Sequence, residues 1–315
     1  MNLGQNQENN EKMTNSEWSN RNCPSCGSDK TNLNADISST SPAENISFKE
    51  VKNYFIGLRD KQTFFSFFRC SNCLLLYSPQ YFSPEQLNEL YSEMPDNLMG
   101  EDRSVALKTQ SIYIKQIAKY VSSTDSFLEL GPDIGLVTKE VISAFNPHTI
   151  TLVEPNKAMW PELRQLDAKD LEIYESVQDI PKSLCNLVVG VHVFDHLVNL
   201  ENEFNAINRN TASSAILSMV VHNEKSILRF LLNKKWPPFC LQHPQLFNPR
   251  SARRMLENYG WEVVKVTRTT NYYTSRNFIQ LALKIIGKEV KLLNKIPIFQ
   301  IPVKLGNILI IAKKK

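Results

Sequence analysis

The stretch from Phe127 to Gly135, FLELGPDIG, decides the fold. Its first half is a short apolar run, and its second half is a turn that contains Gly131 and Gly135. In parallel sheets, ligands bind where strands end, and a glycine there lets the backbone approach the ligand closely. A dinucleotide-binding fingerprint would need glycine at position 133 and glycine or alanine at 136, but the chain has Asp133 and Leu136. The turn therefore predicts a site for an adenosine ligand other than NAD or FAD.

Apolar runs and helical patterns alternate after this turn. The sequence continues with VTKEVISAF, ITLVE, MWPELRQL, LEIY, LVVGV and AILSMVV, in which strand-like runs are separated by helix-like segments. Farther along, PRSARRMLENYG predicts a helix that ends at a glycine, and WEVVKVT and NILIIA predict strands. Strands that alternate with helices form a parallel sheet with right-handed connections. The predicted fold class is α/β.

The predicted second strand ends at Glu154. A carboxylate at this place can accept hydrogen bonds from both hydroxyls of a ribose, although a solvated loop acid is the alternative explanation. Gly131, Gly135 and Glu154 are each weak indications, because short motifs recur by chance. At this spacing they together favour an adenosine-binding site.

From about Phe127 to the C-terminus the chain resembles the class I S-adenosylmethionine-dependent methyltransferases. FLELGPDIG stands where that family has its acid-x-Gly-x-Gly-x-Gly motif, and TLVEPN stands where its ribose-binding acid lies. LVVGVHVFDHLVN is similar to the family's segment after strand four, and HPQLFNPRSARRMLENYGWEVV to its stretch before strand six. The resemblance implies a Rossmann-like seven-stranded methyltransferase sheet with S-adenosylmethionine as cofactor. It also implies that Glu129 and Gly131 face the methionine part and that Glu154 binds the ribose.

Asp133 departs from the family's pattern, which has a glycine at this position. Its side chain could crowd the cofactor, pair with the cofactor's ammonium group, or cap a helix that begins at Ile134, where a carboxylate is favourable. We expect capping, which is compatible with binding, so Asp133 and Gly135 belong to the predicted cofactor site. Crowding would instead make the chain a catalytically degenerate, methyltransferase-like binding protein.

Four of the six cysteines form two pairs, Cys23-x-x-Cys26 and Cys70-x-x-Cys73. Two such pairs supply four thiolates for one tetrahedral zinc ion, and a site filled by four sulfurs is structural because no position stays open. The 43 residues between the pairs exceed the gap of a compact zinc ribbon, so the chain between them must fold as an insertion or a longer loop. The arrangement resembles the N-terminal zinc region of a group of methyltransferases that includes the C-methyltransferases of deoxysugar biosynthesis. Leu74 stands where the second turn usually has a glycine.

Cys185 and Cys240 stand alone and are predicted to be buried fillers rather than nucleophiles. A disulfide would need an oxidising compartment, and the polar N-terminal stretch lacks the apolar core of a secretory signal. No apolar run approaches the roughly 18 to 20 residues of a membrane-spanning helix. The sequence therefore predicts a cytoplasmic protein with reduced cysteines.

The chain divides into four predicted parts. Residues 1–21 form a disordered tail, 22–80 a small zinc-ribbon-like module with strand-like patches YFIGL and FFSFF, 81–122 a helical linker, and 123–315 the methyltransferase domain. In the linker, Ser83 to Gln86 match a capping box that begins a helix reaching about Met94, and a second helix is expected from about Arg103 to Val121.

A helical insertion is expected at about residues 274–304, ahead of the last strand. It contains a Lys-studded amphipathic helix from about Arg276 to Asn294, followed by the apolar stretch IPIFQIP. A cover over the acceptor pocket is the commoner explanation of such a segment. Peripheral contact with a membrane surface is the alternative.

Three histidines are candidates for the catalytic base. Methyl transfer from a sulfonium turns a cation into a neutral group, so the protein mainly aligns donor and acceptor and excludes water. A hydroxyl or carbon acceptor also needs a base, for which histidine is the usual choice. His192 and His196 follow the fourth strand, and His243 precedes the helix at Ser251. A packed structural role is the alternative for His196 and for His243.

The formal net charge of +4 is small, and the lysines and arginines are spread along the chain. Composition therefore gives no support for a nucleic-acid partner. By analogy with the sugar-modifying relatives, we expect a small-molecule or saccharide acceptor, including glycan-linked ones. A zinc-ribbon RNA methyltransferase is a rival hypothesis that predicts salt-dependent RNA binding. The sequence leaves open the oligomeric state and the choice among oxygen, nitrogen and carbon.

Overall fold

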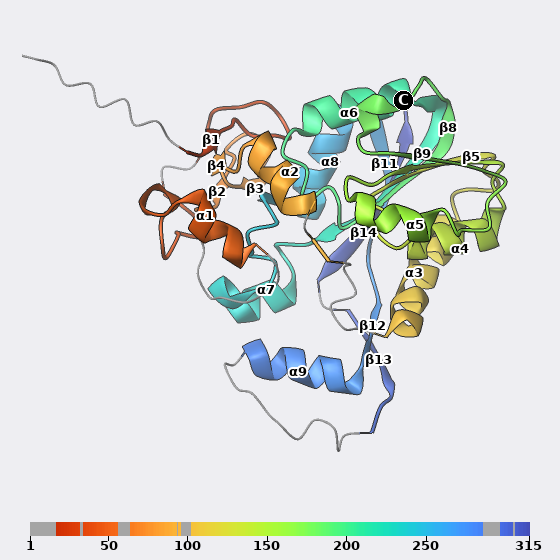
Figure 1. Cartoon of the computed structure of the whole chain (residues 1–315). Helices are drawn as coiled ribbons and strands as arrows, with labels where there is room; N and C mark the ends of the chain where they lie inside the picture. Colours follow the sequence, from red (N-terminus) through yellow and green to blue (C-terminus); the bar gives the residue numbers. More distant parts are fainter. Residues whose placement is uncertain are drawn as a thin grey trace, which may run out of the picture.

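The computed structural model describes residues 17–31, 34–55, 64–92, 94–95, 102–285, 297–304 and 306–315. Its centre is a seven-stranded sheet made of β5 (Ser126–Leu130), β6 (Thr149–Val153), β7 (Asp170–Tyr174), β8 (Cys185–Val191), β9 (Thr211–His222), β11 (Trp261–Arg268) and β14 (Asn307–Lys314). The strand order is β11-β14-β9-β8-β5-β6-β7 (Figure 1). The five neighbouring strands β9, β8, β5, β6 and β7 pair in parallel, and β14 runs antiparallel to both β9 and β11. This arrangement confirms the predicted Rossmann-like sheet.

Helices cover both faces of this sheet. They are α3 (Arg103–Ile117), α4 (Leu136–Phe145), α5 (Trp160–Leu163), α6 (Leu200–Arg209) and α8 (Pro249–Asn258). Successive strand residues point to opposite faces, so Phe127 joins the core under α3 and α4, and Leu128 joins the core under α6 and α8. Both side chains are fully buried. The near-continuous apolar runs of the sequence follow from this burial on both faces.

The N-terminal region forms two small sheets of short strands. Strand β1 (Ser19–Asn20) pairs with β4 (Gln80–Tyr81), and β2 (Phe68–Arg69) pairs with β3 (Leu76–Tyr77). Strand β10 (Gln245–Leu246), from the part of the chain that forms the central sheet, adds to β3. The region also contains η1 (Ala43–Asn45), α1 (Phe48–Val51) and η2 (Lys52–Tyr54).

Within the described residues, the two aromatic patches of this region contribute little to strands. The described part of YFIGL begins in the 3-10 helix η2, and of FFSFF only Phe68 lies in a strand. The rings instead form a cluster in which Trp18, Phe55 and Phe65 meet Phe82 edge-on. Tertiary packing of the aromatic side chains overrides their strand propensity here.

Two partly buried arginines connect the N-terminal region to the part of the chain that forms the central sheet. The Arg69 guanidinium contacts Glu224 at 3.0 Å and Asp36 at 2.8 Å, and the Glu224 side chain is fully buried. Arg21 donates to the backbone carbonyls of Ser78 and Val198. Removing one partner of a buried ion pair leaves an uncompensated charge, so these contacts favour a fixed placement of the region.

The two helices predicted between residues 81 and 122 are present, with slightly different ends. Helix α2 spans Pro84–Ser92, and Ser83 and Gln86 exchange the two hydrogen bonds of a capping box. Helix α3 ends at Ile117 rather than Val121.

The segment between β11 and β14 contains strands as well as a helix. Strand β12 (Asn271–Thr274) pairs with β13 (Gln300–Val303), and α9 (Ser275–Ile285) follows β12 directly. The rest of the predicted Lys-studded helix lies outside the described residues, as does most of the predicted N-terminal tail. Among the described helices, none has the length and apolar character needed to cross a membrane.

Candidate functional site

Two glycines shape the turn between β5 and α4. Gly131 has a φ of +63°, and a Cβ there would lie 2.6 Å from the Val193 side chain. Gly135 has a φ of +76°, and a Cβ there would lie 3.1 Å from the Leu163 side chain. Side chains rarely adopt this left-handed conformation, so both positions require glycine on grounds of backbone and space.

Asp133 also has a left-handed backbone, with a φ of +52°. Helix α4 begins at Leu136, and its N-cap residue is Gly135, so the expected capping of a helix at Ile134 is wrong. The conformation explains why the related methyltransferases can have glycine here. Aspartate is among the few other residues that tolerate it.

Asp133→Gly is expected to change the free energy of unfolding by no more than about 1 kcal/mol, because relief of the left-handed backbone offsets the added chain entropy of glycine. Chemical denaturation of the variant beside the wild type measures this difference. A loss above about 2 kcal/mol would mean that the Asp133 side chain, rather than its backbone, holds the turn together.

Glu154 is held by the backbone around the turn. Its two carboxylate oxygens accept hydrogen bonds from the amides of Asp133 (3.0 Å) and Asn156 (2.8 Å). Glu129 lies deeper and accepts a hydrogen bond from Thr138 at 2.5 Å. Burial raises the pKa of Glu154 to about 7 and that of Glu129 to about 8, and the charge of Asp133 adds to both shifts. The turn therefore gathers three carboxyl groups, which is an electrostatic environment suited to a positively charged ligand.

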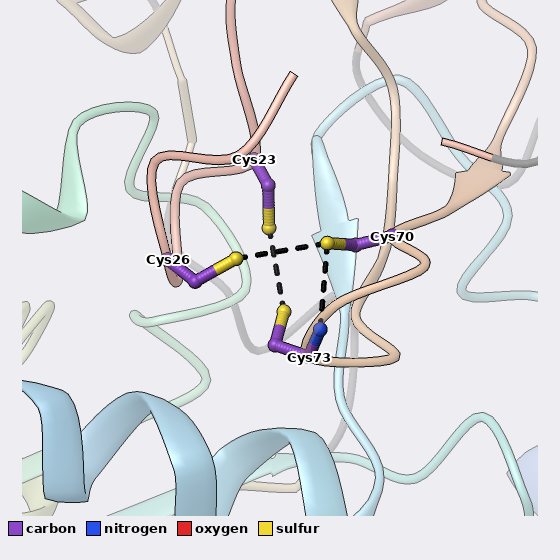
Figure 2. A group of neighbouring side chains, drawn as sticks. All are labelled: Cys23, Cys26, Cys70 and Cys73. Atoms are coloured by element: carbon purple, nitrogen blue, oxygen red, sulfur yellow. Dashed lines mark hydrogen bonds between the residues drawn. The ribbon is translucent and has the colours of Figure 1, made fainter. Parts of the chain in front are cut away.

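The four N-terminal cysteines converge on one point (Figure 2). The sulfurs of Cys23 and Cys73 are 3.4 Å apart, and those of Cys26 and Cys70 are 3.6 Å apart. All four lie within 4.8 Å of one another. A tetrahedral zinc ion with Zn–S bonds of about 2.3 Å separates its sulfurs by about 3.8 Å. The donor set and the spacing both fit such an ion.

The two cysteine turns have the same backbone geometry. In the first, the amide of Gly27 donates to the carbonyl of Cys23 at 2.8 Å, and in the second the amide of Leu74 donates to that of Cys70 at 3.0 Å. Gly27 has a φ of +68° and Leu74 a φ of +67°. The second turn therefore tolerates a side chain by placing leucine in the glycine conformation.

Four of the five histidines meet at the carboxyl edge of the sheet. His192 follows β8, His222 ends β9, and their rings stack at 4.6 Å. His243 lies edge-on to His222 at 4.8 Å and to His196 at 4.7 Å. Asp195 is fully buried beside them and accepts a hydrogen bond from the His222 amide at 2.9 Å. Because Val193 packs over Gly131, this cluster adjoins the cofactor turn.

Asn307 fixes the tautomers of two of these rings. Its Oδ1 accepts a hydrogen bond from Nδ1 of His222 at 2.9 Å, and its Nδ2 donates to Nε2 of His192 at 3.2 Å. Burial lowers the pKa of His192 to about 4 and that of His222 well below its usual value, so both rings are neutral near pH 7. A neutral imidazole has one N–H and one lone pair. Nδ1 of His192 is therefore a donor, and Nε2 of His222 carries a lone pair.

The cluster contains one unpaired donor and one unpaired acceptor. Among the described residues, Nδ1 of His192 and Oδ1 of Asp195 are buried without a hydrogen-bond partner. His192, Asp195 and His222 each bring a candidate ligand atom within 4.8 Å of the others. A cation would need lone pairs from both rings, whereas Asn307 leaves a lone pair on only one. A hydroxyl group, which accepts and donates, fits this arrangement better.

Buried His243 and partly buried Cys240 form a pair, with Nδ1 and Sγ 3.3 Å apart. Burial alone would lower the pKa of His243, but the charges of Cys240 and Asp195 raise it to about 9. Against the effect of burial, His243 lowers the pKa of the Cys240 thiol. Cys240 is therefore not the isolated filler that the sequence predicted, whereas Cys185 is buried as expected.

The predicted histidines occupy different positions in the cluster. Nδ1 of His196 lies 3.1 Å from the Tyr91 hydroxyl, which agrees with a ring held by a neighbour. His222 and Asn307 were missed by the sequence analysis. The position of His222 at the end of a predicted strand could have indicated it, but Asn307 joins the cluster only through the pairing of β14 with β9.

Comparisons with known proteins agree with this architecture. A family model described as a methyltransferase domain matches residues 102–266, which is more than half of the chain. A chain of the complex between the Haloferax volcanii Trm112 methyltransferase activator and a putative methyltransferase is similar, with a TM-score of 0.51, 12% identity, and coverage of 70% of this chain and 99% of that one. The N-methyltransferase NodS of Bradyrhizobium japonicum, solved with S-adenosyl-L-homocysteine, has a TM-score of 0.47 at 10% identity, covering 73% and 97%. The search of curated proteins gave no match. The chain belongs to the methyltransferase family and is a class I, S-adenosylmethionine-dependent enzyme.

Proposed function

We propose that this enzyme transfers a methyl group to a hydroxyl of a small-molecule or glycan-linked acceptor bound between His192 and Asp195. The observation that carries the proposal is the unpaired donor and acceptor in the histidine cluster, Nδ1 of His192 and Oδ1 of Asp195. A buried polar atom without a partner is costly, which favours a ligand that completes both hydrogen bonds.

S-adenosylmethionine would be held by the turn after β5 and by Glu154. A carboxylate has about four lone-pair sites, and the two backbone amides occupy two of them. Each oxygen of Glu154 thus keeps a site for one ribose hydroxyl. Gly131 would let the methionine part pass close to the backbone, and the Glu129 carboxyl would face its positive charges. Asp133 and Gly135 would complete the turn around the ligand.

Asp195 is the base that we propose for a hydroxyl acceptor. When bound, S-adenosylmethionine supplies a methyl carbon on a positively charged sulfur, and the acceptor oxygen forms the new bond as the carbon–sulfur bond breaks. Nδ1 of His192 donates to that oxygen and orients it, and Oδ1 of Asp195 accepts its proton. Burial raises the pKa of Asp195 to about 7, which suits a base that works near neutral pH.

The other predicted histidines would have supporting roles. His243, whose raised pKa keeps it protonated, stabilises the Asp195 carboxylate. His196 would form part of the acceptor wall together with Tyr91.

Zinc would be a structural ion in the N-terminal region, held by Cys23, Cys26, Cys70 and Cys73. The tetrahedral sulfur set supports this proposal, and it leaves no coordination position for substrate. For the division of the chain, we propose a tail (1–21), a zinc module (22–80), and a linker that ends before α3 instead of at residue 122. Helix α3 packs on the central sheet and the family match begins at residue 102, so we assign α3 to the methyltransferase domain.

Asp195→Asn is expected to lower the rate of methyl transfer to hydroxyl acceptors by about 100-fold or more, the usual contribution of a general base. The amide oxygen can still accept the hydrogen bond from the His222 backbone, so the fold and cofactor binding should be retained. A labelled-methyl assay over nucleotide sugars, lipid-linked sugars and small phenols measures the effect. Exposed Asp167→Asn is the matched control.

The pH profile of the methyl-transfer rate in the same assay distinguishes a catalytic role of Asp195 from a structural one. The base must be ionised, so at saturating S-adenosylmethionine, where cofactor affinity does not limit the rate, the wild-type rate should fall about tenfold per pH unit below about pH 7. Under the same conditions Asp195→Asn should lose this dependence. The titratable groups around Asp195 are His192, His196, His222, Cys240 and His243. Unchanged transfer by Asp195→Asn, with an unchanged profile, would refute the role of Asp195.

A further inference from the structure

Helix α7 (Ile227–Leu232) presents three large apolar side chains to solvent. Ile227 is 67% exposed, Phe230 79% and Leu231 71%. Single exposed apolar residues are ordinary on a protein surface, but three on one short helix form a patch that indicates an interaction site.

The opposite side of α7 is firmly packed, so the exposure is not a consequence of a poorly docked helix. Leu228 and Leu232 pack against the buried cluster that contains Trp236 and Phe239. At its start, the side chain of Ser226 accepts a hydrogen bond from the backbone of Arg229 at 3.1 Å. The helix therefore exposes one set of apolar side chains while its other side is packed against the core.

Basic side chains border the patch at both ends. Lys225 precedes the helix, and Lys234 and Lys235 follow it in η5 (Asn233–Lys235), all three exposed. Within the described parts of the chain, Lys234 and Lys235 make no ion pair. Lys225 lies 3.8 Å from Glu224, whose carboxylate is already paired with Arg69. The ammonium groups of Lys234 and Lys235 are therefore available to anionic partners, whereas Lys225 already pairs with Glu224 at 3.8 Å.

We propose that α7 and its flanking lysines form a surface that docks on an anionic lipid bilayer. Apolar side chains that project from a basic border match the boundary between acyl chains and anionic headgroups. A protein partner would also cover apolar side chains, but the lysines at both ends favour a surface with many negative charges.

This surface adjoins the proposed acceptor site. Strand β9 ends at His222, and α7 begins at Ile227. After α7 the chain returns to the cluster through Trp236, whose ring lies edge-on to His222 at 6.2 Å. Docking would hold the cluster near the membrane, which indicates a lipid-linked acceptor. This last step rests on the proposed function, whereas the docking surface itself does not.

Sedimentation of the full-length protein with vesicles tests the proposal. At low salt the wild type should sediment with vesicles of phosphatidylcholine and phosphatidylglycerol and stay in the supernatant with phosphatidylcholine alone. The double variant Phe230→Ser/Leu231→Ser should lose at least tenfold in apparent affinity, and Lys234→Glu/Lys235→Glu should lose binding to the anionic vesicles. Leu184→Ser, at a side chain that is 59% exposed elsewhere, is the matched control and should bind normally.

Three results would overturn the proposal. In the first, the wild type stays in the supernatant with anionic vesicles, and in the second the Phe230→Ser/Leu231→Ser variant still binds them. In the third, the wild type forms an oligomer and binds no vesicles, and the variant is a monomer. The second result would place the contact on another part of the chain, and the third would make α7 an interface between copies. Methyl transfer to a soluble acceptor should be unchanged in the α7 variants. Failure of transfer in every protein would refute the proposed function and leave the sedimentation result intact.

Discussion

Cys70→Ser is expected to release the bound metal and to lower the melting temperature of the entire enzyme by roughly 10 °C or more. Apparent binding of a structural zinc ion contributes about 10 to 16 kcal/mol, and even 4 kcal/mol of lost stability moves the melting temperature of a domain of this size by about 10 °C. The effect reaches beyond the N-terminal region because Cys70 and Cys73 belong to the same hydrophobic cluster as Phe204 and Leu217 of the main domain.

Metal analysis and thermal denaturation of the purified variant measure the two effects together. Cys185→Ser is the matched control, because Cys185 is a fully buried thiol outside the cluster of four. Cys185→Ser should keep one zinc per chain. Its free energy of unfolding should fall only by the modest amount expected when a polar side chain is buried. A Cys70→Ser protein that retains zinc and melts like the wild type would refute the structural zinc site.

Glu154→Ala is expected to weaken S-adenosylmethionine binding by about 100-fold or more and to abolish methyl transfer at ordinary cofactor concentrations. Two ribose hydrogen bonds to a charged acceptor contribute roughly 1.5 to 3 kcal/mol each. The substitution also removes the acceptor for the Asp133 and Asn156 amides, so Glu154→Gln, which keeps an oxygen in place, is the second variant. Exposed Glu172→Ala, on the neighbouring strand β7, is the control.

The pH dependence of S-adenosylmethionine binding tests whether Glu154 is the group that binds the ribose. Hydroxyl donors prefer the ionised carboxylate, and burial raises the pKa of Glu154 to about 7. The affinity of the wild type for S-adenosylmethionine should therefore fall about tenfold per pH unit below pH 7. In Glu154→Gln the affinity should depend less on pH. Asp133 and Glu129 are the neighbouring acids. Wild-type affinity in Glu154→Ala would refute the ribose assignment.

Local backbone requirements made the shape of the turn after β5 predictable from sequence. Gly131 and Gly135 occupy left-handed positions, and a Cβ would clash with Val193 at Gly131 and crowd Leu163 at Gly135, so these requirements appear directly as glycines in the chain. The convergence of the four cysteines was predictable for a similar reason, because the ligand chemistry of a metal site selects cysteine at a fixed spacing in each turn. The helix-capping role predicted for Asp133 is wrong because α4 begins after Gly135, whose backbone rather than a polar side chain forms the N-cap.

The histidine cluster could be predicted only in part, because it depends on tertiary pairing. The register between β14 and β9 brings the Asn307 side chain to His222, 85 residues away in the chain, and to His192, 115 residues away. The pairing of Cys240 with His243 is local, and a Cys-x-x-His spacing was visible in the sequence. The same dependence on tertiary packing explains the aromatic patches, whose rings pack around Phe82 rather than forming strands.

Calorimetric titration of the full-length protein with S-adenosylmethionine tests the central claim most directly. The account predicts saturable binding of one molecule per chain, and at 100 times the dissociation constant a stabilisation of about 2.7 kcal/mol that appears as a raised melting temperature. Absence of heat and of any thermal shift at millimolar ligand would contradict it, and the turn from Gly131 to Gly135 would then belong to a degenerate relative that has lost its cofactor.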